Sequence, residues 1–120
     1  MRCSTEKLVV VGQGYVGLPL ALRAAEVGFS VVGYDADETR IKRLATGDSY
    51  VEDVSATALL AALGTKRYEP TTDPQRCAGF DVAVIAVPTP LADGVPDLSH
   101  VEEAARLLGG RLRAGGTVIL

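Results

Sequence analysis

The sequence predicts an α/β fold, a doubly wound parallel sheet with helices on both faces. Short continuous apolar runs alternate along the chain with segments of helical periodicity, and this order is typical of parallel strands joined by right-handed crossovers. Hydrophobic residues make up 48% of the 120 residues, but aromatic residues only 5%. This aliphatic composition favours a sheet buried between helices over a β-sandwich, and the length is sufficient for one domain with its own core.

The first two strands are predicted from apolar runs, and the helix between them from the glycine at its end. Residues 7–12 (KLVVVG) are predicted to form a buried strand. Residues 15–28 are predicted to form a helix ending at Gly28, because glycine suits the position just after a helix. Residues 30–35 (SVVGYD) are predicted to form the second strand.

Two further helices are indicated by the residues at their ends. The segment 37–47 has Asp37 as its predicted N-cap and Gly47 as its stop. The segment 55–64 begins at Ser55, whose hydroxyl can accept a hydrogen bond from the first turn. Both segments therefore read as helices that follow the second strand.

The middle of the chain contains the next two predicted strands. Residues 68–73 (YEPTTD) can hold a short strand, and residues 74–79 form a helical turn. Residues 80–87 (FDVAVIAV) are predicted to form the fourth and most apolar strand.

The predicted helix over residues 99–116 opens with a capping box, in which Ser99 is followed three residues later by Glu102. Gly109 and Gly110 interrupt this helix, at a cost of about 1 kcal/mol each relative to alanine. Nothing in the sequence assigns these two glycines a function.

The last apolar run, residues 117–120 (TVIL), predicts a strand that ends at the final residue. A doubly wound domain usually continues to a sixth strand. We therefore expect the chain to be part of a longer protein, truncated after about the fifth strand. Such a strand would leave an exposed edge with apolar faces. We expect the chain to be a monomer or to self-associate weakly through residues 117–120.

Gly12, Gly14 and Gly17 form the pattern G-x-G-x-x-G between the first predicted strand and the first predicted helix. In a dinucleotide-binding Rossmann fold, the first glycine permits a tight turn and the second lets a pyrophosphate approach the backbone. The third lets the helix pack closely on the sheet. The start of the helix directs free N–H groups and its positive dipole end at the phosphates. Without a ligand, the same pattern is a tight strand-to-helix turn.

The second predicted strand ends at Asp35, 18 positions after Gly17. A carboxylate at this place accepts hydrogen bonds from the adenosine ribose of a bound dinucleotide. It would also repel a 2′-phosphate, so NAD is favoured over NADP. Arg40 lies one turn into the next helix and can contact the adenine or the ribose, although a solvated helix arginine is nearly as good an interpretation.

Charge and chemistry-bearing side chains exclude other classes of function. The net charge of −3 argues against electrostatic binding of nucleic acid or an anionic membrane, and no apolar run is long enough to span a membrane. Cys3, Cys77 and His100 are too few and too scattered for a metal site. We expect reduced thiols and, with no signal peptide visible, a cytoplasmic protein. His100 is expected on a helix surface.

Four ordered blocks of the sequence resemble the UDP-glucose/GDP-mannose dehydrogenase family. They are "VVVGQGYVGLPLA", "YDADETRIKRLATGDSYVEDV", "AVIAVPTPL" and "PDLSHVEEAARLL". The combination of "VPTPL" with "PDLSHV" is most similar to the branch acting on UDP-N-acetylmannosamine or UDP-N-acetylglucosamine. The resemblance covers nearly the whole chain.

The resemblance implies a longer enzyme and a reaction. The family has an N-terminal NAD-binding domain, a helical central segment that forms a homodimer, and a C-terminal domain that binds the UDP-sugar. It oxidises the C6 alcohol of the sugar to a carboxylate with two NAD, through a thiohemiacetal and a thioester on a cysteine. Residues 1–120 correspond to the NAD-binding domain. The intact enzyme would supply sugar uronates for polysaccharide biosynthesis.

The family's cofactor-binding pattern can be placed on this sequence residue by residue. It comprises the glycine loop with two intervening loop amides, the ribose acid, a basic residue five positions later, and a V-P-T-P turn after the fourth strand. The turn's threonine would offer its hydroxyl to the ribose or nicotinamide half of the cofactor. The resemblance thus implies cofactor contacts from Gly12, Gly14, Tyr15, Val16, Gly17, Asp35, Arg40, Val87, Pro88 and Thr89.

The sequence departs from the family pattern at several points. Gln13 stands where the family usually has a small or apolar residue, and its side chain is expected to point away from the phosphates. The basic residue often found before "PDLS" is missing. The family's catalytic threonine, lysine, asparagine and cysteine lie beyond residue 120, so no catalytic residue is expected here and the chain alone should be inactive. The alternative is a non-catalytic module that senses NAD or an adenine nucleotide.

Overall fold

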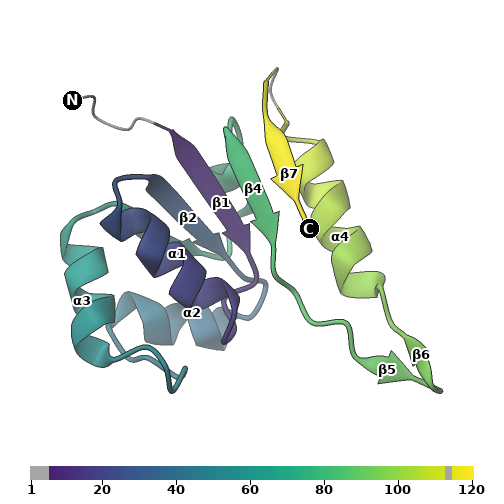
Figure 1. Cartoon of the computed structure of the whole chain (residues 1–120), viewed down its shortest axis with the longest axis horizontal. Helices are drawn as coiled ribbons and strands as arrows, with labels where there is room; N and C mark the ends of the chain where they lie inside the picture. The colour runs from purple at the N-terminus through teal and green to yellow at the C-terminus, as the bar shows by residue number, and fades with distance from the viewer. Residues whose placement is uncertain (1–5, 113–114) are drawn as a thin grey trace.

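The computed structural model describes residues 6–112 and 115–120. A five-stranded parallel sheet in the order β3-β2-β1-β4-β7 forms its centre (Figure 1). The predicted α/β doubly wound sheet is thereby confirmed. The strands of this sheet are β1 (Lys7–Val11), β2 (Ser30–Tyr34), β3 (Tyr68–Thr71), β4 (Val82–Ile85) and β7 (Thr117–Ile119).

The central strand β1 is buried on both sides because its neighbours and the helices cover it completely. Leu8 and Val10 face one hydrophobic cluster, whereas Val9 and Val11 face the other. A strand between two parallel neighbours, with helices above and below, has no water-facing side. This explains the continuous apolar run at this place in the sequence.

The helices lie on both faces of the sheet, as predicted. The first face packs against α1 (Gly17–Glu26), α2 (Glu38–Ala45) and α3 (Ala56–Gly64). The second packs against α4 (Ser99–Gly109) and a short 3₁₀ helix, η1 (Pro74–Cys77). Figure 1 shows α1 in front of the sheet and α4 behind β7.

The predicted helix ends are observed for three helices. The Asp37 carboxylate accepts hydrogen bonds from the backbone N–H groups of Thr39 and Arg40, at 2.9 and 3.2 Å, and so caps α2. The Ser55 hydroxyl accepts from the N–H of Ala58 at 3.1 Å and caps α3. Gly28, with φ of +113°, follows the C-cap of α1, in a conformation that favours glycine.

The predicted capping box of α4 is wrong. Ser99 is already the first helical residue, and the Asp97 carboxylate accepts its N–H at 2.9 Å. An aspartate side chain readily accepts a hydrogen bond from the N–H two residues further on. The turn therefore starts at Asp97, and Ser99 already lies inside the helix. The predicted end is wrong as well, because α4 stops at Gly109 with Gly110 as its C-cap. The two glycines therefore end the helix and do not interrupt it.

A small antiparallel hairpin between β4 and α4 was not predicted. It consists of β5 (Leu91–Ala92) and β6 (Val95–Pro96), with Asp93 and Gly94 at positive φ in its turn. Asp-Gly is a strong signal for such a turn. However, strands of two residues give no alternation to detect. Figure 1 shows the hairpin projecting from the end of the sheet.

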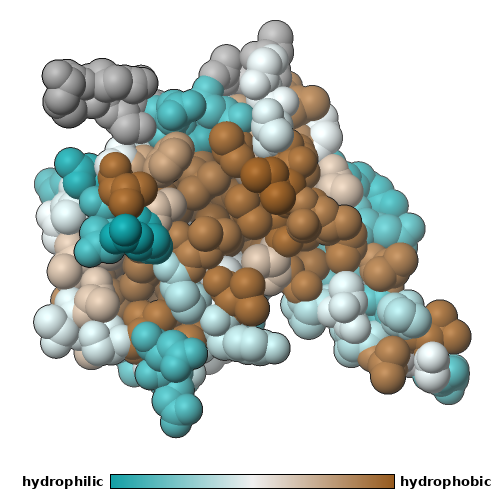
Figure 2. All heavy atoms as spheres, viewed as in Figure 1, coloured by the Kyte–Doolittle hydropathy of each residue, from teal (hydrophilic) through white to brown (hydrophobic). Residues whose placement is uncertain are grey.

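One edge of the sheet is formed by β7, as expected for the last strand. Val118, Ile119 and Leu120 are 45, 49 and 81% exposed. Figure 2 shows hydrophobic residues gathered around β4 and β7, on the face of the sheet where α1 lies but where no helix covers these two strands. Among the described residues, no helix is both long and apolar enough to cross a bilayer.

Candidate nucleotide-binding site

A cavity of about 850 Å³ opens at the carboxyl ends of β1, β2 and β4. The chain runs from β1 outward to β3 and then returns to place β4 on the other side of β1. In open parallel sheets, ligands bind in the crevice created by this reversal. The cavity has the size of typical small-molecule sites.

The first wall of the cavity is the glycine loop that follows β1. Gly12 has a φ of +99°, and a Cβ there would lie 2.6 Å from the Ala86 carbonyl oxygen after β4. A Cβ on Gly17 would collide with the carbonyl of Gly12, so this glycine lets α1 start directly against the loop. A Cβ on Gly14, by contrast, would meet only the Arg40 guanidinium, at 3.7 Å. Packing alone therefore does not require glycine at position 14, whereas close approach of a ligand would.

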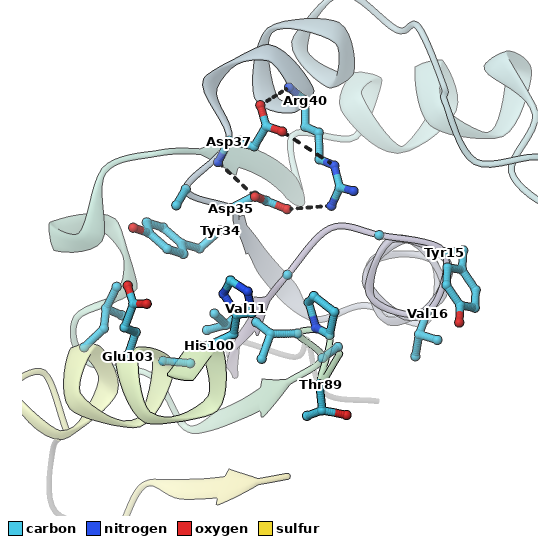
Figure 3. Close-up of a pocket in the computed structure, with 18 of the residues that line it drawn as sticks. Val11, Tyr15, Val16, Tyr34, Asp35, Asp37, Arg40, Thr89, His100 and Glu103 are labelled. Atoms are coloured by element: carbon cyan, nitrogen blue, oxygen red, sulfur yellow. Dashed lines mark hydrogen bonds and ion pairs between the residues drawn. The ribbon is translucent and has the colours of Figure 1, made fainter. Parts of the chain in front are cut away.

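The first turn of α1 offers backbone N–H groups to this wall. Its N-cap residue is Val16, no side chain caps it, and its first turn contains no acidic residue. The N-terminus of a helix carries a partial positive charge and suits an anion. Tyr15 and Val16 are 79 and 58% exposed, and their side chains point away from the cavity (Figure 3). These two residues can therefore contribute their backbone to the site.

Asp35, just after β2, forms the acidic part of the site. One carboxylate oxygen accepts the N–H of Gln13 at 2.9 Å and lies 3.4 Å from the Arg40 guanidinium. The other oxygen accepts the N–H of Asp37 at 2.9 Å (Figure 3). The Asp35 side chain is only 12% exposed. Its carboxylate is thus held toward the glycine loop, where it can accept hydrogen bonds from hydroxyl groups of a ligand.

Gln13 provides a network that the sequence alone did not reveal. Its side chain is fully buried, as expected of a residue pointing away from the cavity. Its amide donates to the carbonyls of Val10 and Gly12 at 3.1 Å, and its side-chain oxygen accepts the Tyr68 hydroxyl at 2.6 Å. Gly33 leaves room for this side chain, because a Cβ there would collide with its oxygen. The only signal in the sequence was a polar residue at an apolar position.

The opposite wall comes from the turn after β4 and from the first turns of α4. Val87, Pro88 and Thr89 line it together with His100 and Glu103. Figure 3 shows His100 and Glu103 on the side facing Asp35, whereas the Thr89 side chain points away from Asp35. His100 is exposed on its helix, as expected, but its place beside the cavity was not predicted.

The structure brings the predicted contact residues together at one place. All except Gly17 line the cavity, and Gly17 lies beneath the loop. The sequence missed several lining residues at the end of β2, just after it and on α4. Those on α4 were missed because helix residues that face a cavity look like ordinary surface residues in the sequence. The missed residues include Tyr34, Ala36, His100, Glu103 and Leu107.

The cysteine prediction is tested only in part. Cys77 is a buried free thiol in η1, and burial raises its pKa to about 11, which makes it unreactive. Cys3 lies outside the described residues. Within the described part of the chain, no group of histidine, cysteine and acidic residues could hold a metal ion.

The sheet order, the glycine loop and the acid after β2 together define a dinucleotide-binding domain of the Rossmann type. Residues 6–120 match the NAD binding domain of the UDP-glucose/GDP-mannose dehydrogenase family. The chain belongs to this family, and the predicted cofactor, NAD, agrees with the domain that is matched.

Individual relatives point to the same family. The chain is 34% identical to a UDP-N-acetyl-D-mannosamine dehydrogenase of Pyrococcus horikoshii, over 95% of this chain and 28% of the relative. It is 36% identical to a UDP-N-acetyl-D-glucosamine 6-dehydrogenase of Pseudomonas aeruginosa, over 94% of this chain and 26% of the relative. The solved structure of a UDP-D-ManNAc dehydrogenase from P. horikoshii superposes with a TM-score of 0.90 at 34% identity, covering 93% of this chain and 27% of that one. The chain thus spans about a quarter of the length of these relatives.

Proposed function

We propose that this chain is the NAD-binding part of a nucleotide-sugar 6-dehydrogenase that oxidises the C6 alcohol of a UDP-N-acetylhexosamine to a carboxylate. The observation that carries the proposal is the Asp35 carboxylate, held beside the uncapped start of α1 and the glycine loop. The relatives named for UDP-N-acetylhexosamine substrates support the choice of sugar.

The described residues fit NAD in two respects. Gly14 leaves open space at the loop, and the first turn of α1 presents N–H groups that a pyrophosphate can accept. Asp35 would hold the adenosine ribose, with Arg40 beside it, and the turn of Val87, Pro88 and Thr89 would border the other half of the cofactor. NAD, when bound, supplies the hydride acceptor for each of the two oxidation steps. The residues of this chain bind and orient it.

The wider setting belongs to the same proposal. We place the intact enzyme in the cytoplasm, as a homodimer that feeds polysaccharide biosynthesis, with residues 1–120 as its NAD-binding domain. The chain alone is expected to bind NAD without turnover. It is expected to be monomeric, or to associate weakly through the exposed β7 strand.

Calorimetric titration of the chain with NAD, NADP and a UDP-N-acetylhexosamine tests the binding function. We expect the strongest heat from NAD. Asp35→Ala should weaken NAD at least about tenfold and narrow its advantage over NADP, because charge-assisted hydrogen bonds to the ribose are lost.

Gly14→Val tests the phosphate loop in the same titration. It should abolish NAD binding while the chain remains folded, because the new side chain enters the space of the ligand and not of the core.

Two outcomes would contradict these assignments. Equal affinity for NAD and NADP in the wild type would show that Asp35 is misassigned. An unchanged affinity of Gly14→Val would reject the loop.

A further inference from the structure

Tyr50 lies in the connection between α2 and α3, within the second block of family resemblance but with no role assigned to it there, and it touches both parts of the proposed ribose site. Its hydroxyl donates to the backbone carbonyl of Gln13 at 2.5 Å. Its ring lies 5.5 Å from the Arg40 guanidinium and 5.3 Å from that of Arg43. One side chain therefore connects the glycine loop with the basic partner of Asp35.

The hydroxyl contact fixes the peptide that leads into Gly14. Gln13 uses its N–H to hold Asp35 and its carbonyl to hold Tyr50, so the two peptide groups on either side of this residue are both anchored. Burial raises the pKa of Tyr50 to about 12, so its hydroxyl remains a protonated donor at neutral pH. If this bond is lost, the carbonyl has no side-chain partner to hold the loop against Asp35.

The ring contact acts on the other side of the site. The Arg40 side chain is 44% exposed, and its guanidinium lies 3.4 Å from Asp35 and 3.9 Å from Asp37, both long distances for an ion pair, so a third contact helps to fix its position. The Tyr50 ring provides this surface through a cation–π contact. Arg43 shares the ring but is already engaged by Asp48, with its Nε 2.9 Å from one carboxylate oxygen. Arg40 therefore remains the guanidinium that faces the Asp35 carboxylate.

We propose that Tyr50 is a positioning residue that sets the preference of this site for NAD over NADP. The inference rests on the proposed function, because it assigns the ribose to Asp35. With Tyr50 in place, the carboxylate is held where a 2′-phosphate would lie and Arg40 is held against it. Without Tyr50, the Gln13 peptide that holds one Asp35 oxygen loses its second anchor, and Arg40 keeps only its contacts with Asp35 and Asp37, so it can turn toward the phosphate.

The test uses two variants that separate the hydroxyl from the ring. Tyr50→Phe keeps the ring and removes the hydrogen bond, whereas Tyr50→Leu removes both. The Kd values for NAD and NADP are measured by calorimetry, and Tm is measured in the absence of ligand. Tyr50→Phe should weaken NAD binding roughly 3- to 10-fold, as expected for the loss of one hydrogen bond. It should weaken NADP binding less. Tyr50→Leu should reduce the NAD-to-NADP preference further, by about 2- to 5-fold.

Thr65→Val provides the matched control. The Thr65 hydroxyl donates to the Ala62 carbonyl at 2.7 Å at the end of α3, away from the cavity. The variant loses a hydroxyl-to-carbonyl bond of the same kind, together with the bond that the Thr65 hydroxyl accepts from the Arg67 N–H at 3.1 Å, and should keep both affinities within twofold of the wild type. The change in the ratio of the two Kd values is decisive. If Tyr50 had a purely structural role, its loss would lower Tm and weaken the binding of NAD and NADP equally.

The outcomes separate the two proposals. A wild type that prefers NAD, with both Tyr50 variants keeping that preference within twofold, overturns the role of Tyr50 and leaves the proposed function intact. Equal weakening of NAD and NADP with a lower Tm overturns it as well. A wild type that binds neither cofactor overturns the proposed function together with this inference. If Tyr50→Leu does not fold, Tyr50→Phe decides alone.

Discussion

The two walls of the cavity are held in place by different means. The wall formed by the glycine loop and Asp35 is anchored by hydrogen bonds from β3, from the connection after α2 and from the start of α2. The wall after β4 is a turn with two prolines that leads into an exposed hairpin, whose Leu91 and Val95 are 73 and 63% exposed. The first wall depends on many distant contacts, whereas the second depends on the stiffness of its own chain. Substitutions should therefore be costly in the first wall and mild in the second.

The largest effect is expected for Gly17→Ala, which introduces a Cβ against the Gly12 carbonyl. Because a backbone carbonyl in a packed loop cannot move aside easily, we expect a loss of about 3 kcal/mol in the free energy of unfolding. Urea denaturation measures this loss. Gly14→Ala is the control and should change stability by less than about 0.5 kcal/mol, since its Cβ meets only a flexible guanidinium. Equal effects of the two would refute the packing role of Gly17.

A smaller effect is expected for Tyr68→Phe in the buried network. The Gln13 side-chain oxygen would lose its donor in a fully buried position. Leaving such an acceptor unsatisfied costs about 1–3 kcal/mol.

Tyr34→Phe in β2 is the matched control for this change, because its hydroxyl makes no hydrogen bond within residues 6–112 and 115–120. It should alter the free energy of unfolding by less than about 0.5 kcal/mol. Similar denaturation midpoints for Tyr68→Phe and the wild type would show that the network contributes little to the first wall.

The smallest effect is expected in the second wall. Asp97→Ala removes the carboxylate that accepts the Ser99 N–H at the start of α4, and should cost about 1 kcal/mol. Ser99→Ala should cost less, because this serine caps no N–H and its hydroxyl only adds to the contact that its N–H already makes with Asp97. Thermal unfolding of the two variants compares them directly. A larger loss for Ser99→Ala would restore the capping box that the sequence suggests.

Part of the site is readable from the sequence because its signals are local. The glycine spacing places three small residues within six positions, and Asp35 follows an apolar run at a distance set by one helix and one strand. Asp37 and Ser55 cap the helices that follow them directly, so their roles depend on a few neighbouring residues. Element order, sheet class, the three glycines and Asp35 rest on signals of this kind, whereas the contacts predicted for Tyr15, Val16 and residues 87–89 came from the family resemblance.

The tertiary structure decided the rest, because the deciding contacts join residues that are far apart in the chain. Gln13 looked like a tolerated exception, and only the approach of Tyr68, 55 positions away, gives its buried oxygen a partner. Tyr50 lies in a block of family resemblance but received no role from it, since its hydrogen-bond partner is the carbonyl of a residue 37 positions earlier. Amino-acid order by itself determined where the strands of the main sheet, most of the helices and the glycine loop form. How rigidly the glycine loop and Asp35 are held was decided when β3 and the connection after α2 packed against them, because a buried hydrogen bond requires both partners to be present.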